Sequence, residues 1–329
     1  MTPVFMTLLR STFAAALLIS GAAYSQEANY PNRPIKLIVG LTPGASSDTV
    51  AREVAKGLSD VLKVPVIVEN RPGANTIIAS NMVAKSAPDG YTLLVSSSMN
   101  ATNPWVYEKL PYDYRKDLKH VVLLGDAPNM MAASSKAPAS NLKELIAYAK
   151  QNPWKFSYGT AGIGSVHHLL MEIVAKRSGI QLNHIPYKGG SVAIQDVIGG
   201  NLDSYFGTIS STRNFIQRGD MKPLFVTSEK RSRYMPQVET LEDNGLRNLN
   251  SGYWLGLAAP SGVPDAIVQR LNRAANEVLK SPEVVERLER QSIDPKGGSV
   301  SDMEKFFESE LVFWKEAASA AKVTPMAIQ

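Results

Sequence analysis

Hydroxyl-bearing and small residues gather near the start of the chain, where an apolar segment runs into a helix. The segment 35–39 is followed by the loop Pro43-Gly44-Ala45-Ser46-Ser47-Asp48, and apolar residues then recur at helical spacing as far as Leu62. Ser46 or Ser47 is the expected N-cap of this helix. Backbone N–H groups and hydroxyls at such a helix start face one point at the positive end of the dipole, which binds anions well. Taken alone, the pattern is more typical of an ordinary strand-to-helix turn.

The same arrangement of residues recurs in the middle of the chain, and this repetition favours an anion-binding role for both loops. A short strand ending at Tyr158 leads into the glycine-rich loop 159–165, and a helix is predicted from Val166 to Ser178. A looser copy follows, with a strand at 184–187, two glycines, and a helix that Gly199-Gly200 ends. Helix N-termini from separate loops can converge on one anionic ligand.

The loop 159–165 lacks what several catalytic sites require. It has the G-x-x-x-x-G spacing of a nucleotide P-loop, but Ser165 and Val166 stand where that motif needs Lys and then Ser or Thr. No G-x-G-x-x-G follows the first strand, so a dinucleotide-binding fold has no support. Without a G-x-S-x-G elbow, a nucleophilic site of Ser165 with His167 or His168 is disfavoured. The adjacent histidines point to different helix faces and make a poor metal pair; one is expected in the core or a pocket and the other in solvent.

Arg71 and Lys188 are the candidate cationic contacts for an anion. For Arg71, a salt bridge that pins the loop Arg71-Pro72-Gly73 is favoured over contact with a ligand. For Lys188, which precedes two glycines, a structural role and ligand contact are weighted equally. Tryptophans are expected in the core, and Trp254 is the one for which this assignment is weakest.

The composition indicates an exported globular protein without thiol chemistry. The 329 residues include no cysteine, which excludes thiolate catalysis, cysteine-held zinc and iron–sulfur clusters. Lys and Arg are spread along the chain despite a formal charge of +5, so no nucleic-acid partner is expected. Residues 1–25 are predicted to be a secretory signal peptide, in which Arg10 precedes the apolar run 13–19 and Met1 or Met6 is the start. No other segment is apolar enough for a membrane helix.

Strands and helices alternate along the first hundred residues. Apolar segments separated by helices predict three strands, at 35–39, 66–68 and 91–95. This spacing gives right-handed crossovers and a parallel sheet. The segment 103–114 is expected to be a loop with at most one helical turn, and separate strands are predicted at 121–124 and 130–133. A capping box at 301–304 is expected to begin a C-terminal helix rich in aromatic residues.

Eight short motifs, in this order along the chain, resemble those of the Bug-type solute receptors of tripartite tricarboxylate transporters. They are Tyr30-Pro31-Asn32-Arg33-Pro34-Ile35, Pro43-Gly44-Ala45-Ser46-Ser47-Asp48, Val68-Glu69-Asn70-Arg71-Pro72-Gly73-Ala74, Ala87-Pro88-Asp89-Gly90-Tyr91-Thr92-Leu93-Leu94, Lys109-Leu110-Pro111-Tyr112-Asp113, Tyr158-Gly159-Thr160-Ala161-Gly162, Pro186-Tyr187-Lys188-Gly189, and the residues around Ala258 and Pro260. The resemblance covers essentially the whole chain after the signal peptide. Each motif alone is weak evidence, whereas the set is specific.

The resemblance implies a two-lobed Venus-flytrap receptor of the α/β class, the architecture of periplasmic binding proteins, in which each lobe is a mostly parallel sheet flanked by helices. Lobe 1 would comprise residues 26–125 plus 250–329, and lobe 2 residues 126–249. Such a receptor holds a small carboxylate between its lobes, mainly through backbone N–H groups, hydroxyls and ordered waters of the first and mid-chain loops. It works in the periplasm with the membrane components of the transporter. No catalysis, metal or cofactor is expected, and the chain is expected to be a monomer.

The chain departs from the pattern of that family at two positions. In the first loop Ala45 replaces the usual second glycine, which restricts the backbone there. Gly207 follows Phe206 where the family often has Asp, so a partner for a ligand ammonium group is missing. An amino-acid ligand is therefore disfavoured.

The expected ligand-binding residues lie in the loops described above and on the strand ends beside them. They are Pro43, Gly44, Ala45, Ser46, Ser47, Asp48, Ser97, Tyr158, Thr160, Ala161, Gly164, Ser165, His168, Tyr187, Phe206 and Gly207. Ser and Thr are expected to bind carboxylate oxygens, while Ala161 and Gly164 offer backbone N–H groups. Asp48 is expected to orient its loop instead of touching an anion, since like charges repel.

The ligand is expected to be a dicarboxylate. Tyr158, Tyr187 and Phe206, with Trp254 as a further candidate, would form an apolar wall between the helix N-termini. Such a wall favours a flat aromatic dicarboxylate by a small margin over an aliphatic one. Citrate is disfavoured because its hydroxyl and third carboxylate would lack polar partners there. Two other functions stay open: a receptor that reports its ligand to a sensor protein, and an exported hydrolase, for which no convincing nucleophile and base are found.

Overall fold

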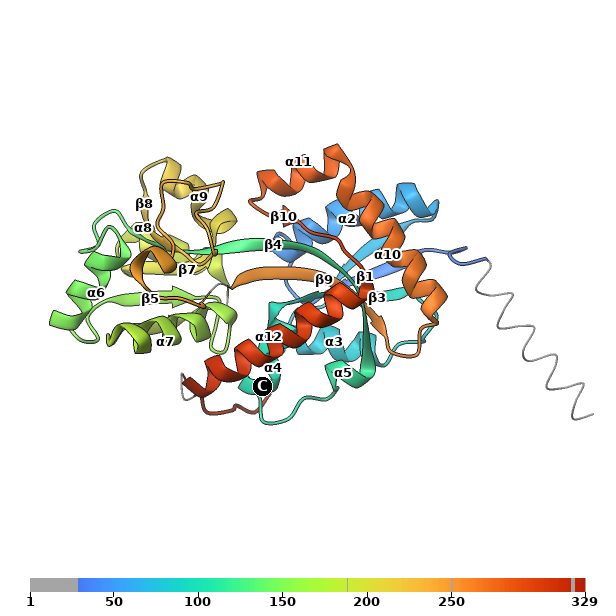
Figure 1. Ribbon diagram of the computed structural model, residues 1–329, viewed down its shortest axis with the longest axis horizontal. Coiled ribbons are helices and arrows are strands. Elements are labelled where there is room, and N and C mark those ends of the chain that lie inside the picture. Colours follow the sequence, from blue (N-terminus) through green and yellow to red (C-terminus); the bar gives the residue numbers. More distant parts are fainter. Residues whose placement is uncertain (1–28, 188, 250, 321–322, 329) are drawn as a thin grey trace, which may run out of the picture.

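The structure is a computed structural model that describes residues 29–187, 189–249, 251–320 and 323–328. The predicted signal peptide and the candidate contact Lys188 lie outside the described residues. Two halves lie next to each other along the long axis, and two long strands, β4 (Leu118–Ser134) and β9 (Gly252–Pro260), link them (Figure 1). Within the described residues, no helix has both the length and the apolar character that a membrane crossing needs.

The half that begins the chain is built on three parallel strands, β1 (Ile35–Val39), β2 (Val66–Asn70) and β3 (Thr92–Ser97). The strand β1 lies between the other two, with Leu37 level with Val68 and Leu93. The connecting helices are α2 (Ser46–Leu62) and α3 (Ile77–Ala84), the latter after a 3-10 turn, η1 (Ala74–Thr76). The apolar residues of α2 that recur at helical spacing are buried against the sheet, as the sequence predicted.

The other half repeats this arrangement. The strands β5 (Ser157–Thr160), β6 (Asn183–Pro186) and β7 (Ser204–Thr208) are parallel in the order β6-β5-β7, and β8 (Met221–Val226) pairs antiparallel with β4. Its helices are α6 (Leu142–Gln151), α7 (Val166–Ser178), α8 (Gly190–Gly199) and α9 (Ile209–Gln217), with a 3-10 turn η2 (Glu242–Asn244). Each half therefore has the expected α/β arrangement, with helices flanking mostly parallel strands.

The strand β4 belongs to both halves. It pairs with β9 from Leu118 to Pro128, and beyond that point it pairs with β7 and β8. The separate strands predicted at 121–124 and 130–133 are thus one strand of 17 residues. Gly125 and Asp126 interrupt the apolar pattern, but β9 and the short strand β10 (Asp294–Pro295) pair with the backbone there. These partners are more than a hundred residues away, so the local pattern could not reveal the continuity.

The segment 98–106 forms a helix, α4 (Ser98–Val106), that the sequence pattern did not predict. Its Ser, Asn, Thr and Pro residues are poor helix formers in isolation. Hydrogen bonds from distant residues compensate, because Asn100 Nδ2 donates to Ser80 Oγ at 2.8 Å and Asn103 Nδ2 donates to the Asn75 carbonyl at 3.0 Å. Tertiary contacts therefore override the local propensity in this helix.

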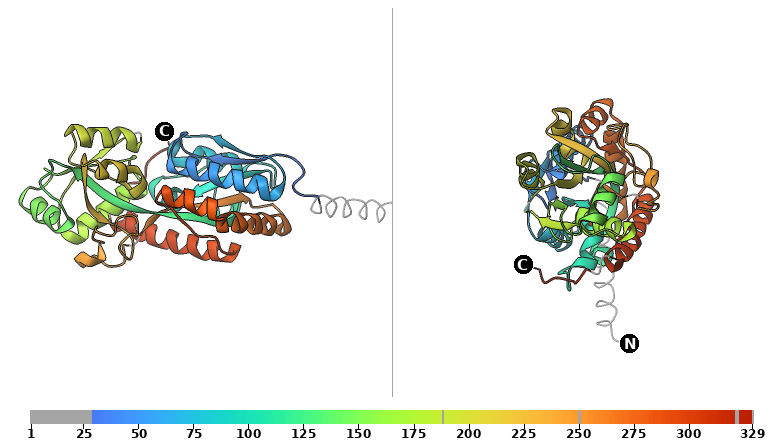
Figure 2. Two further views of the ribbon diagram at one scale, coloured as in Figure 1. Left: turned by 90° about the horizontal axis from the view of Figure 1, so that it is seen from above. Right: turned by 90° about the vertical axis from the view of Figure 1, so that its left-hand side faces the viewer.

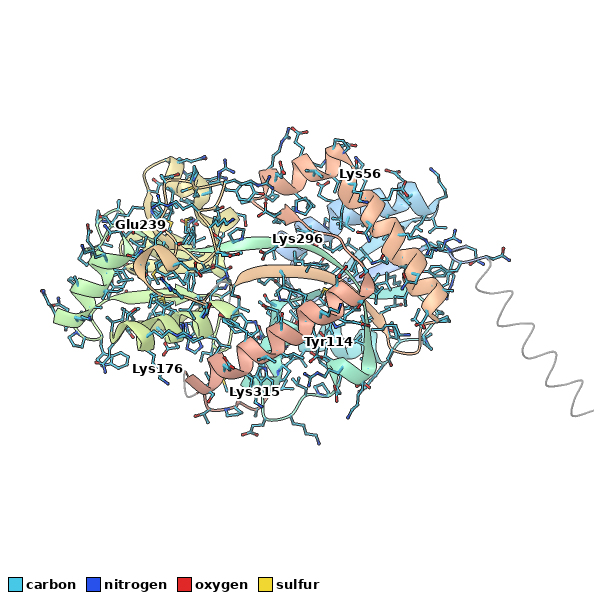
Figure 3. The ribbon with its side chains drawn as sticks, viewed as in Figure 1. Lys56, Tyr114, Lys176, Glu239, Lys296 and Lys315 are labelled. Atoms are coloured by element: carbon cyan, nitrogen blue, oxygen red, sulfur yellow. The ribbon has the colours of Figure 1, made fainter. Side chains whose placement is uncertain are left out.

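Three C-terminal helices complete the fold: α10 (Asp265–Lys280), α11 (Pro282–Arg290) and α12 (Val300–Ala320). The helix α12 lies along α4 and β4 and reaches α7 of the other half (Figures 1 and 2). Tyr114 of α5 (Tyr114–Asp117) lies next to α12 (Figure 3). Its ring stacks on that of Phe307 in α12, with centroids 4.4 Å apart.

Two further sequence expectations are settled by contacts of α12. The Trp254 indole N–H donates to Glu310 at 2.8 Å, and the side chain is 1% exposed, so Trp254 is a core residue. The reciprocal bonds that begin α12 join Ser299 and Asp302. The capping box therefore starts two residues before the predicted one at 301–304.

Candidate functional site

Asp48 organises the first loop. Its buried carboxylate accepts hydrogen bonds from the Gly44 N–H at 2.9 Å, Arg52 Nε at 3.0 Å and Asn70 Nδ2 at 2.9 Å. Burial alone would raise the pKa of Asp48, but these bonds outweigh it and hold the pKa below its ordinary value. The expectation that Asp48 orients its loop is confirmed, since both carboxylate oxygens already have partners.

The start of α2 differs from the predicted one. Ala45, not Ser46 or Ser47, is the N-cap, with φ −68° and ψ 158°, and it makes no side-chain cap bond. Alanine adopts this extended conformation without strain, so the missing glycine does not distort the loop. The two serines instead lie in the first turn, where Ser47 is 3% exposed and its hydroxyl has no hydrogen-bond partner in the part of the chain that the structure describes. Pro43 and Gly44 are exposed, and Ala45 and Ser46 are half-buried.

The mid-chain loop leads into the helix α7, which spans the predicted residues Val166–Ser178. Ser165 is the N-cap of α7, and its hydroxyl accepts a hydrogen bond from the His168 N–H at 3.3 Å. His168 Nδ1 in turn accepts from the Gly164 N–H at 3.2 Å, so the imidazole of this predicted site residue braces the loop. Thr160 Oγ1 donates to the Gly162 carbonyl at 3.1 Å, while Ala161 is half-buried.

His184, which the sequence reasoning did not single out, completes this bracing. Its ring stacks on that of His168, with centroids 4.1 Å apart and an interplanar angle of 18°, and its Nε2 lies 2.9 Å from Thr160 Oγ1. Burial, with a smaller contribution from His168, lowers the pKa of His184 to about 3, so the ring is neutral at pH 7. No spacing in the sequence signals this pair, because His184 comes from β6 and His168 from α7.

The N-termini of α2 and α7 meet at the linking strand β9. Burial raises the pKa of the Tyr253 phenol, and the neighbouring hydroxyls of Ser97 and Ser47 lower it in part. The Tyr253 ring also faces the ring of His167, with centroids 6.4 Å apart and an interplanar angle of 21°. Among the described residues, no group stands in hydrogen-bonding geometry to the Tyr253 hydroxyl or to that of Ser47, although the Ser97 and Ser47 hydroxyls lie near the phenol. Tyr253 was not among the residues expected at the site.

The mid-chain loop also touches the other half directly. A Cβ atom placed on Gly164 would lie 2.2 Å from Val106 Cγ1 at the end of α4. The absence of a side chain at this position therefore allows the two halves to approach where the helix N-termini meet.

Comparisons with known proteins agree with this geometry. The model of the tripartite tricarboxylate transporter family receptors matches residues 50–321 of the chain. The chain belongs to this family. Protein BugT of Bordetella pertussis is 35% identical over 312 residues, which make up 94% of this chain and 96% of BugT.

Solved structures of similar receptors have the same fold. Rpa4515 of R. palustris, solved with adipate, matches with a TM-score of 0.84 at 29% identity over 90% of this chain and 100% of that one. MatC from Rhodopseudomonas palustris, solved with bound malate, matches with a TM-score of 0.80 at 27% identity over 88% of this chain and 100% of that one. The receptor thus has the two-lobed α/β architecture of periplasmic binding proteins.

Two of the aromatic residues expected along the ligand are core residues of the receptor. Tyr158 is 0% exposed, and its hydroxyl donates to Glu172 at 2.8 Å. Phe206 is also 0% exposed and packs against the rings of His167 and Phe225. Both side chains face the interior because their strands, β5 and β7, are covered there by helices. They do not form the apolar wall that the sequence suggested.

The remaining predicted positions have structural partners of their own. The Tyr187 hydroxyl donates to Asp196 at 2.6 Å from a half-buried position. Gly207 is buried beside Tyr205, where a Cβ atom would come within 2.3 Å of that ring. Arg71 forms a salt bridge, as predicted, and its partner is Glu69.

Proposed function

We propose that this receptor is exported to the periplasm, binds a short aliphatic dicarboxylate between its lobes, and delivers it to the membrane components of a tripartite tricarboxylate transporter. The observation that carries the proposal is the meeting of the α2 and α7 N-termini beside the buried, unpartnered hydroxyl of Ser47. Positive dipole ends on both lobes suit a ligand with a carboxylate at each end. The adipate and malate bound to the two similar receptors belong to this chemical class.

An aliphatic ligand is favoured over the aromatic one that the sequence suggested. A flat ring needs an accessible apolar wall, and the burial of Tyr158 and Phe206 removes two members of that wall. The proposed division keeps lobe 1 at residues 26–125 plus 250–329 and lobe 2 at 126–249. The receptor is proposed to act as a monomer.

Replacing the free hydroxyl of the first loop tests the proposed site. We expect Ser47→Ala to weaken dicarboxylate binding by about tenfold or more, because a hydrogen bond to a charged carboxylate is lost. Ser301→Ala is the matched control, since Ser301 is exposed in the first turn of α12 and should leave affinity unchanged. Isothermal calorimetry with succinate, glutarate and adipate measures both variants. Equal affinities of Ser47→Ala and wild type would place the site elsewhere.

The mechanism predicts compaction when ligand binds. A ligand held by both helix N-termini stabilises the arrangement in which Gly164 approaches Val106, because only that arrangement offers both sets of contacts. We therefore expect a smaller radius of gyration in small-angle scattering when the tightest-binding dicarboxylate is added at saturation. An unchanged radius would contradict closure by the ligand.

A further inference from the structure

His167 and Tyr253 carry two buried polar atoms that the proposed carboxylate contacts do not use. The side chains are 5% and 4% exposed, and neither the imidazole Nδ1 nor the phenolic hydroxyl has a hydrogen-bond partner among the described residues. They come from different elements, the first turn of α7 and the linking strand β9. Buried polar atoms nearly always have partners, so two such atoms on facing rings point to a ligand group between the lobes.

A chain of hydrogen bonds through Asn129 assigns the proton on His167. Asn129 Nδ2 donates to the Ser251 carbonyl at 2.9 Å, which leaves its Oδ1 facing His167 Nε2 at 3.0 Å. An amide oxygen only accepts, so Nε2 carries the hydrogen. Burial lowers the pKa of His167 to about 4, and the ring is therefore neutral at pH 7. In this tautomer, Nδ1 is a hydrogen-bond acceptor on the side of the ring away from Asn129.

A buried acceptor distinguishes one class of carboxylate from another. Carboxylate oxygens only accept hydrogen bonds and a methylene group offers none, so an unsubstituted dicarboxylate leaves Nδ1 unpaired. A hydroxyl group can donate to His167 Nδ1 and accept from the Tyr253 hydroxyl at the same time. An ammonium group could also donate, but it needs an anionic partner. Asp48 is already bound by three neighbours, and Gly207 supplies no carboxylate.

We propose that His167 Nδ1 and the Tyr253 hydroxyl form a subsite for a hydroxyl group of the ligand, so that the receptor prefers a hydroxy-substituted dicarboxylate. The inference rests on the proposed function, in which the helix N-termini hold the carboxylates. Ser47 is also a neighbour of the Tyr253 hydroxyl, so the proposed carboxylate and hydroxyl contacts are adjacent. This adjacency fits a 2-hydroxy acid, in which the two groups are on neighbouring atoms.

Acids that differ by a single hydroxyl test the subsite on the wild-type receptor. The pairs are succinate with malate and glutarate with 2-hydroxyglutarate, titrated by calorimetry alongside adipate. One of the two chain lengths should fit the site better. In the pair of that length, we expect the hydroxy acid to bind about three- to tenfold more tightly than the unsubstituted acid. Equal or weaker binding of the hydroxy acid in both pairs would overturn the subsite and leave the proposed function standing. Failure of all five acids to bind would overturn the proposed function, and the subsite with it.

Variants locate the preference in the two residues. Tyr253→Phe keeps the ring and His167→Phe removes the acceptor, and each should bring the two acids of a pair to within about twofold of each other while the unsubstituted acid keeps its affinity. Tyr114→Phe is the matched control, because it also deletes a buried hydroxyl without a partner but lies under α12. His167→Phe leaves Asn129 Oδ1 unpaired and could fail to fold, in which case Tyr253→Phe decides. If Tyr253→Phe prefers the hydroxy acid as strongly as the control Tyr114→Phe does, the assignment of the hydroxyl subsite to Tyr253 and His167 is overturned.

Discussion

Gly164→Ala is expected to weaken ligand binding by about 100-fold. The residue has φ +74°, where alanine costs about 1–2 kcal/mol, and the new Cβ would lie 2.2 Å from Val106 Cγ1. Overpacking of this kind adds about 1–3 kcal/mol to the arrangement in which the lobes meet. Because only that arrangement presents both helix N-termini to the ligand, its lower population reduces the apparent affinity directly. Calorimetry with the preferred dicarboxylate measures the change.

Gly179→Ala separates the steric effect from the backbone effect. Gly179 ends the same helix, α7, with φ +64°, but a Cβ there meets nothing within 4 Å. It should lower the free energy of unfolding by about 1 kcal/mol and leave affinity unchanged. Adding Val106→Ala to Gly164→Ala should recover part of the lost affinity, since the colliding methyl groups are removed. Similar affinity losses in both glycine variants, without recovery in the double variant, would contradict this account.

The parts of the fold that local pattern determines could be predicted from the sequence. The helix α7 spans the residues expected for it, because its N-cap Ser165 and its terminal Gly179 both act within one turn of the helix. The strand β4 and the helix α4 could not be predicted, because their stability comes from residues far away in the chain. Asn100 is a poor helix former, but it is held in place by Ser80 of a different helix.

The same distinction applies to the candidate site. The two loops were predicted to bind an anion from glycine, serine and helix spacing alone, which are local features. Tyr253 and His184 were missed because their roles depend on residues that only the folded chain brings near them. Tyr253 lies near Ser47 and His167. His184 stacks on His168. The aromatic wall failed for a related reason. An aromatic residue next to a glycine loop has the same local pattern whether its ring faces the ligand or, like Tyr158, the core.

Asp48→Asn is expected to lower the free energy of unfolding by about 3 kcal/mol at pH 7. Both carboxylate oxygens of Asp48 accept hydrogen bonds, one from the Gly44 N–H and Arg52 Nε, the other from Asn70 Nδ2. An amide replaces one acceptor by a donor, so in either orientation two donors face each other in a buried place. Asp60→Asn is the matched control, because Asp60 is exposed on the same helix and should change stability by less than about 0.5 kcal/mol.

The pH dependence of this difference tests the cause. Burial alone would raise the pKa of Asp48, but the bonds from Arg52, the Gly44 N–H and Asn70 hold it below the ordinary value of 3.8. A carboxyl whose pKa is lowered by folding contributes stability above its unfolded pKa and loses that contribution as pH falls through the folded value. Urea denaturation should therefore give a constant difference between wild type and Asp48→Asn from about pH 7 to pH 5, and a shrinking one below about pH 4. A difference that stayed constant down to about pH 3 would mean that the charge of Asp48 does not stabilise the first loop.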